Sequence, residues 1–209
     1  QVFLAALQHQ LDKPMLIVTH NMFSAQKIAE DLQDCIAREN VLLYPANELM
    51  AAEAAISSPE TLAQRMDVLI SLAKGFRGIV VVPFSGIRRY LPSKEAIVEA
   101  ELSFAVEQEL PTDLFINKLI ELGYSRVDMV ETKGEFSVRG GIIDFYPATS
   151  KLAIRVEWYG DDIDSIRTFD TTDQRTIDRL QSYTVTPAQE ILASRERMAT
   201  AARHGANLL

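Results

Sequence analysis

The clearest hydrophobic pattern in the chain is a strict alternation of apolar and polar residues, whose period of two predicts a half-buried β-strand. Phe136 and Val138 alternate with Ser137 and Arg139. Arg139 is therefore expected to point away from the core. The pair Gly140-Gly141 follows, and it is compatible either with a two-residue hairpin turn or with a bulge inside one kinked strand.

A second alternating stretch follows the break at Pro147. Its apolar and polar positions are Ile154, Val156 and Trp158 against Arg155, Glu157 and Tyr159. Arg155 and Tyr159 are thus expected to share a polar face. A third candidate strand, residues 164–169, follows the acidic turn Gly160-Asp161-Asp162, so an antiparallel meander is predicted.

In the first 92 residues, short apolar runs alternate with segments whose apolar residues recur at helical spacing. The run Pro14 to Thr19 is typical of a parallel strand that is covered on both faces. Residues 41–44 and 78–84 are two further strand candidates. Strands that alternate with helices predict a βαβ unit and one parallel sheet.

The helices of this part are expected over residues 2–11, from a cap at Asn21 or Ser24 to Ile36, and over residues 59–73 after a cap at Ser58. The apolar positions of the second helix recur at helical spacing. They are Ala25, Ile28, Ala29, Leu32, Cys35 and Ile36. Cys35, the only cysteine, is therefore expected to be a buried and inert thiol.

Composition changes at Leu91-Pro92-Ser93, where a second domain is predicted to begin. It contains a strand at residues 103–106, a helix at 112–122 and then the meander, and it is expected to end near Pro187. The predicted division is an α/β domain over residues 1–92, an α+β domain over 93–187, and a short helix-prone segment over 188–209.

The totals are those of an ordinary globular protein, because 47% of the 209 residues are hydrophobic and 24% are charged. No stretch of about 18 apolar residues could span a bilayer, and no signal peptide pattern is visible at the start. A single cysteine fits a reducing compartment. A cytoplasmic protein without a membrane partner is expected.

The net charge of −8 is concentrated in the middle of the chain. Residues 93–187 hold 10 Lys and Arg against 18 Asp and Glu, whereas residues 1–92 hold 8 against 9. Phosphate neutralisation by basic residues dominates nucleic-acid affinity. Surface arginines in so acidic a segment are therefore expected to meet protein carboxylates instead of DNA.

Candidate catalytic chemistry is sparse. Neither Gly-x-x-x-x-Gly-Lys-Ser/Thr nor Gly-x-Gly-x-x-Gly occurs, so the sequence contains no phosphate-binding loop. His20 follows a strand but has no partner at metal-ligand spacing, and Ser85 lacks a nucleophile-elbow context. Asp161, Asp162 and Asp164 are interpreted as a solvated turn. No catalytic residue, cofactor or metal is predicted, and the chain is not expected to be an enzyme.

Several stretches together carry a family resemblance that extends over nearly the whole chain. They are Leu42-Leu-Tyr-Pro45 with Asn47-Glu48, Ser58-Pro-Glu60 through Gln64-Arg65, Val80-Val-Val-Pro83 with Ile87-Arg-Arg89, Gly134-Glu-Phe to Pro147, and Asp164-Ser-Ile-Arg167 with Phe169-Asp170 and Gln174-Arg175. The chain thereby resembles the N-terminal, UvrB-like region of the bacterial transcription-repair coupling factors, the Mfd family. Unlike UvrB, it has no long aromatic-rich insertion between Tyr44 and Ser58.

The resemblance implies a degenerate, non-hydrolysing RecA/helicase-like lobe with an inserted domain at residues 93–187 that imitates the UvrA-binding domain of UvrB. In that family the inserted domain recruits UvrA to stalled RNA polymerase. ATP-driven translocation, DNA binding and polymerase binding lie in other modules. The implied role of this chain is recruitment for nucleotide excision repair in the bacterial cytoplasm.

Carried over from the family, the UvrA-contacting positions fall on Arg139, Arg155 and Tyr159. The alternative is that these arginines only pair with Glu157, Asp161 or Asp162 on their own surface. Two other functions stay open. One is a UvrB-type ATP-dependent enzyme, which would need a phosphate loop. The other is an autoinhibitory domain whose arginine-bearing face docks on another module of the same protein and masks the UvrA site.

Overall fold

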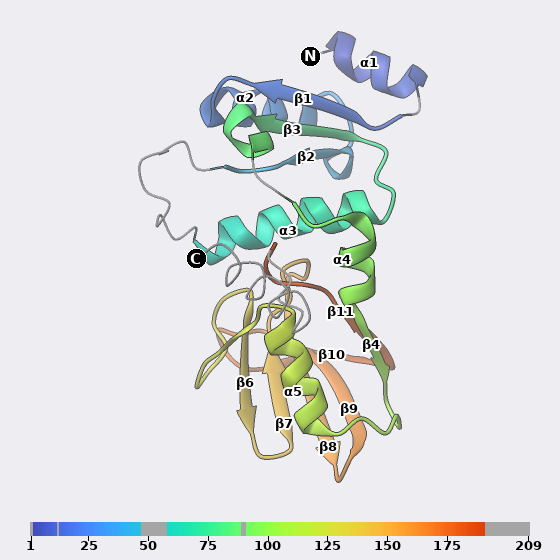
Figure 1. The fold of residues 1–209 in the computed structure, drawn as a ribbon, viewed down its shortest axis with the longest axis vertical. Helices are drawn as coiled ribbons and strands as arrows, with labels where there is room; N and C mark the ends of the chain where they lie inside the picture. Colours follow the sequence, from blue (N-terminus) through green and yellow to red (C-terminus); the bar gives the residue numbers. More distant parts are fainter. Residues whose placement is uncertain (1, 12, 47–57, 89–90, 191–209) are drawn as a thin grey trace, which may run out of the picture. The chain divides into compact units, whose positions relative to one another are not determined.

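Two kinds of sheet organise the chain, a parallel sheet in its first part and a mainly antiparallel sheet in its second (Figure 1). The computed structural model describes residues 2–11, 13–46, 58–88 and 91–190. It divides into two units, residues 1–95 and 96–209. The expected mixture of helices with parallel and antiparallel sheets is confirmed. The predicted domain boundaries at residues 92 and 187 stay predictions, and residues 191–209 of the helix-prone tail lie outside the described residues.

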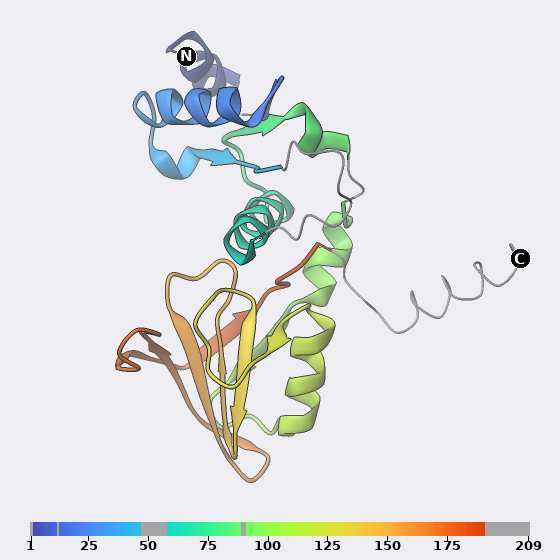
Figure 2. The same ribbon diagram turned by 90° about the vertical axis from the view of Figure 1, so that its left-hand side faces the viewer.

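The first unit is a three-stranded parallel sheet with the order β1-β3-β2, which confirms the predicted βαβ arrangement. Its helices α2 and α3 lie on opposite faces of this sheet (Figures 1 and 2). The elements are α1 (Val2–Leu11), β1 (Met15–Thr19), α2 (Met22–Gln33), the 3-10 helix η1 (Arg38–Asn40), β2 (Val41–Leu43), α3 (Pro59–Ala73), β3 (Ile79–Pro83) and the 3-10 helix η2 (Phe84–Arg88).

Helix α2 is capped by Asn21, whose side chain accepts a hydrogen bond from the backbone N–H of Ser24. The helix ends at Gln33, two residues before Cys35. The prediction of a buried thiol is therefore wrong: Cys35 is exposed because it lies past the end of the helix that was expected to bury it.

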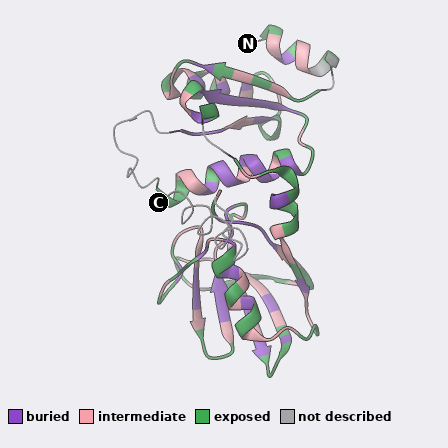
Figure 3. Ribbon diagram, in the orientation of Figure 1, coloured by how far each residue is buried: buried purple, intermediate pink, exposed green. Residues whose placement is uncertain are grey.

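Strand β3 is buried along its whole length because it is the central strand of the three (Figure 3). Strand β1 differs from its prediction. Leu16 and Val18 are 60% and 46% exposed, whereas Met15 and Ile17 pack against the core on the α2 side. As an edge strand, β1 is covered on one face only, and the expectation of cover on both faces is wrong.

The second unit contains a six-stranded sheet with the order β10-β9-β8-β7-β6-β5. Its neighbours are antiparallel, as the meander predicted, except that β5 runs parallel to β6. A separate two-stranded sheet pairs β4 with β11. The elements from the junction onward are α4 (Lys94–Ala100), β4 (Leu102–Ala105), α5 (Thr112–Glu121), β5 (Ser125–Arg126), β6 (Glu135–Arg139), β7 (Ile142–Phe145), β8 (Ala153–Tyr159), β9 (Asp162–Phe169), β10 (Thr176–Leu180) and β11 (Ser182–Val185).

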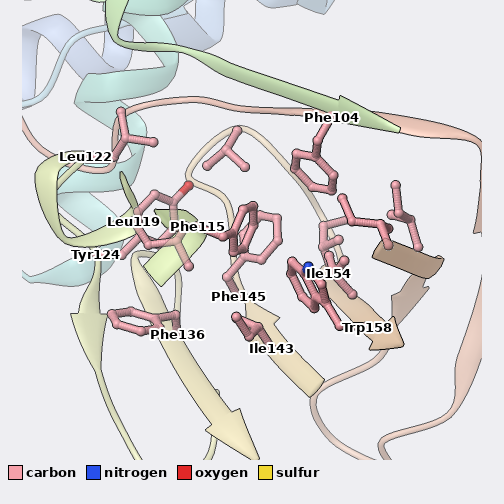
Figure 4. Close-up of a cluster of buried hydrophobic side chains, with 14 of the residues drawn as sticks. Phe104, Phe115, Leu119, Leu122, Tyr124, Phe136, Ile143, Phe145, Ile154 and Trp158 are labelled. Atoms are coloured by element: carbon pink, nitrogen blue, oxygen red, sulfur yellow. The ribbon is translucent and has the colours of Figure 1, made fainter. Parts of the chain in front are cut away.

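One face of the six-stranded sheet packs against α5 and forms the core of the unit (Figures 2 and 4). Phe115 of α5 is fully buried, and its ring centroid lies 5.1 Å from that of Phe104 and 5.2 Å from that of Trp158. The indole Nε1 of Trp158 donates to the carbonyl of Leu110 at 2.8 Å. The opposite face of the sheet carries polar residues beside a smaller buried cluster of Val130, Ala153 and Phe169.

The Gly140-Gly141 pair forms a hairpin turn, which decides between the two alternatives left by the sequence. Strands β6 and β7 are antiparallel, with Arg139 opposite Ile142. Gly140 has φ = 61°, a backbone conformation that favours glycine. The turn brings the start of β7 back along β6, so the residues of the two strands share faces in a fixed register.

Candidate functional site

The side of the six-stranded sheet that carries Arg139, Arg155 and Arg167 lies opposite the α5 core, and we call it the arginine face. Two cross-strand rows build it. One row contains Ser137, Asp144, Arg155 and Arg167 on β6, β7, β8 and β9, and the other contains Arg139, Ile142, Glu157 and Ser165. Because side chains alternate along each strand, the predicted apolar and polar faces of β6 and β8 are confirmed.

Asp144 joins the two predicted arginines. Its side chain is only 2% exposed, and it accepts hydrogen bonds from Arg155 Nε at Oδ1 (2.7 Å) and from Arg155 Nη2 at Oδ2 (2.9 Å). Arg139 Nη2 donates to the same Oδ2. Arg139 reaches this carboxylate diagonally, from the neighbouring row of the face. A single buried carboxylate therefore orients two guanidinium groups.

Three residues of its own chain hold the guanidinium of Arg155. Besides Asp144, it donates from Nη2 to Oε1 of Gln174 at 3.0 Å, and its Cζ lies 4.5 Å from the ring centroid of Phe169. The Asp144 hydrogen bonds raise the pKa of Arg155 further above its ordinary value, against the opposing effect of burial. Only 17% of this side chain is exposed, so Arg155 is less displayed than the alternation predicts.

Arg139 is the more accessible of the two, with 49% of its side chain exposed at the hairpin end of β6. Only its Nη2 is engaged by Asp144. A guanidinium has five N–H donors in a planar fork, so donors of Arg139 remain for an external acceptor.

A second ion pair lies beside the first. Arg167 Nη2 is 2.6 Å from Glu157 Oε2, and the hydroxyl of Ser165 donates to the same oxygen at 3.0 Å. The two charged side chains are about equally accessible, at 25% and 24%. Glu157 thus forms its ion pair with Arg167, and its charge acts on Arg155 only at longer range.

Tyr159 stands at the far end of β8, opposite Asp162, where the β8–β9 turn begins. Its side chain is 83% exposed, the largest exposed fraction among the large hydrophobic residues of the described part of the chain. An aromatic ring so placed is available to an external surface. The structure places Tyr159 on the same strand as Arg155 and two rows beyond it.

The remaining sequence candidates do not assemble into a catalytic or metal centre in the described part of the chain. His20 is exposed at the end of β1, and Ser85 lies in η2 of the same unit. Asp161, Asp162 and Asp164 are exposed around the β8–β9 turn. Across residues 2–11, 13–46, 58–88 and 91–190, no three or more His, Cys, Asp or Glu side chains gather as metal ligands. Within the same ranges, no helix has the length and apolarity to cross a bilayer.

Sequence reasoning placed Arg139 and Arg155 on one face, but it named the wrong carboxylates for them. The alternative pairing with Glu157, Asp161 or Asp162 is wrong for both arginines, because Asp144 binds them. A signal for Asp144 was present: it is the one charged residue in the run Ile142 to Phe145, and the hairpin register puts it opposite Ser137. Phe169 and Gln174 were missed as neighbours of Arg155. The β8–β9 register places Phe169 diagonally opposite Arg155, and Gln174 reaches it from the connection between β9 and β10.

Comparison with known proteins places this face in a family context. Residues 102–191 match the model of the UvrB interaction domain. The chain is 44% identical over 200 residues, 96% of its length, to a transcription-repair-coupling factor of Bacillus subtilis (strain 168). A second transcription-repair-coupling factor, from Staphylococcus aureus (strain bovine RF122 / ET3-1), is 35% identical over 187 residues, and these residues make up 90% of the chain. The chain spans only 17% and 16% of these two relatives.

Proposed function

The chain is a UvrB-homology region of the transcription-repair-coupling factor family, and on that premise we propose that it is a non-catalytic recruitment module that binds UvrA. By binding UvrA it brings nucleotide excision repair to stalled RNA polymerase. In this proposal residues 1–92 are a degenerate helicase-like lobe. Residues 93–187 are the inserted UvrA-binding domain, and residues 188–209 return to the lobe.

One observation carries the proposal: the stretch that matches the UvrB interaction domain, residues 102–191, is the stretch that builds the arginine face. Arginine and tyrosine are enriched among the residues that dominate protein–protein binding. Among the three proposed contact residues, Arg139 and Tyr159 are the most exposed. Asp144 holds the guanidinium of Arg139 in one orientation. A preorganised side chain loses less conformational entropy when it binds.

In this proposal Arg155 has two roles, one in contacting the partner and one in positioning Asp144. Its exposed edge contacts UvrA, and its buried donors keep the Asp144 carboxylate in place for Arg139. The module itself performs no reaction. In this proposal ATP-driven translocation and the binding of DNA and RNA polymerase belong to other modules of the full-length protein, and the setting is the bacterial cytoplasm.

Binding of UvrA to residues 1–209 by isothermal titration calorimetry tests the proposal. We expect Arg139→Ala to weaken binding by about 2 kcal/mol, because a central arginine contact of an interface is lost. Arg175→Ala is the matched control, since Arg175 is 84% exposed on the turn before β10 and outside the arginine face. Unchanged affinity in Arg139→Ala, Arg155→Ala and Tyr159→Ala would reject the site, and absence of any complex would reject the function.

A further inference from the structure

The first cross-strand row of the arginine face continues one strand further than the sequence suggested. Arg167 on β9 is directly opposite Arg179 on β10. The complete row therefore runs Ser137, Asp144, Arg155, Arg167, Arg179 across five strands. Neighbouring strands are about 4.8 Å apart, so the row extends over roughly 19 Å.

Three arginines side by side are unfavourable for the sheet itself, because like charges directly opposite each other repel. Arg155 is compensated by Asp144, and Arg167 by Glu157. Arg179 is exposed, and among the described residues its side chain forms no ion pair or hydrogen bond. The neighbouring Leu180 packs against the core, which places Arg179 on the opposite side, with the arginine face.

The arginine row is positively charged, whereas the unit around it is strongly acidic. Residues 96–190 contain 9 Lys and Arg against 18 Asp and Glu, a net charge of −9. Four of the nine basic residues belong to the two rows of the arginine face: Arg139, Arg155, Arg167 and Arg179. Only two carboxylates, Asp144 and Glu157, belong to the same rows. Within these two rows there is therefore a local excess of two positive charges on a strongly acidic unit.

We infer that the partner-binding face extends to β10 and that Arg179 binds a carboxylate on an acidic protein surface. This inference deepens the proposed function and rests on it, with UvrA as the partner that supplies the surface. Two partner carboxylates, one near Arg139 and one near Arg179, would balance the charge excess of the two rows. A protein with a local acidic patch is favoured over a nucleic acid, because a nucleic acid carries phosphates along its whole length and would also meet the acidic remainder of the unit.

The test compares Arg179→Glu with Arg175→Glu, which changes the net charge by the same amount at a position outside the rows. We expect Arg179→Glu to weaken UvrA binding at least about fivefold relative to Arg175→Glu, and to lessen the dependence of the affinity on salt. Circular dichroism melting of both variants checks the fold; because Arg179 is exposed, the two melting temperatures are expected to agree.

The outcomes separate the extension from the proposed function. If Arg139→Ala weakens the complex while Arg179→Glu binds UvrA as Arg175→Glu does, the extension to β10 is wrong and the proposed function stands. If the unaltered chain forms no complex with UvrA, both are wrong. If Arg179→Glu abolishes binding of duplex DNA and leaves the UvrA affinity unchanged, the face is a nucleic-acid site and the inference is overturned.

Discussion

Arg155 Nε lies 2.7 Å from Oδ1 of Asp144, directly across the β7–β8 pair. The other carboxylate oxygen accepts from Arg155 Nη2 at 2.9 Å and also from Arg139. The two guanidinium groups thus neutralise a carboxylate that is only 2% exposed, and this carboxylate in turn orients both of them. Stability and the orientation of the arginine face are coupled through this one residue.

Replacing Asp144 by Asn is expected to lower the free energy of unfolding by about 3 kcal/mol, because it leaves the mostly buried Arg155 without a carboxylate. Urea unfolding followed by the fluorescence of Trp158, the only tryptophan, measures the change. Asp173→Asn is the control, since its ion pair with Arg175 is exposed and contributes at most about 1 kcal/mol. Equal losses in the two variants would contradict a structural role for Asp144.

Phe115→Ala is expected to lower the free energy of unfolding by about 3–5 kcal/mol, since it leaves a cavity between α5 and the sheet. Its neighbour Leu114 is 59% exposed on the same helix, so Leu114→Ala should change stability by no more than about 0.5 kcal/mol. The same urea titration compares them. A small effect of Phe115→Ala would mean that α5 does not cover this face of the sheet.

Stability is expected to fall in alkaline solution because of Tyr183. Burial raises the pKa of Tyr183 from 10.0 to about 12, and it also raises the pKa of Tyr124, whose hydroxyl donates to the carbonyl of Thr186. Between these pKa values the unfolded chain has lost the proton and the folded chain has kept it. The contribution of the protonated Tyr183 to the free energy of unfolding is therefore complete below pH 10, and it is lost as the pH rises toward 12.

Urea titrations at several pH values above 10 test this dependence. We expect Tyr183→Phe to flatten the decline by up to about 1.4 kcal/mol per pH unit relative to the unaltered chain. Tyr159→Phe serves as the control because its hydroxyl belongs to a side chain that is 83% exposed. A decline that is equally steep in both variants would show that Tyr183 is not buried.

Cys35 is expected to react with a water-soluble disulfide reagent in the folded chain, because its side chain is exposed beyond the end of α2. The rate in native buffer should lie within about tenfold of the rate in urea, whereas a buried thiol would react only through unfolding. Complete protection in native buffer would restore the reading of Cys35 as a core residue. Cys35→Ser should leave stability within about 0.5 kcal/mol.

Local pattern was sufficient for most elements of the fold. The period of two in β6 and β8 identified the two faces of the sheet. The cap at Ser58 placed the start of α3, and the structure chose Asn21 over Ser24 as the cap of α2. These signals act between residues that are neighbours in the chain, so the sequence alone contains them. The same alternation predicted that Arg139 points away from the core and that Arg155 lies on the polar face of its strand; the strand register places the two on one face.

Local sequence pattern could not predict which faces of a strand or helix are buried by the rest of the protein. The apolar run of β1 is the same whether one face or two are covered, and Cys35 continues the helical spacing although α2 has already ended. Both predictions failed because burial depends on where elements distant in the sequence pack, a property of the tertiary structure.

The alternation of strands and helices and the family resemblance could be read from neighbouring residues and recurring motifs of the sequence. The contacts of Asp144 with both arginines, of Phe169 and Gln174 with Arg155, and the extension of the row to Arg167 and Arg179 became visible only in the folded chain. They follow from strand register, because hydrogen bonding across five strands brings side chains up to 42 positions apart, from Ser137 to Arg179, into one line.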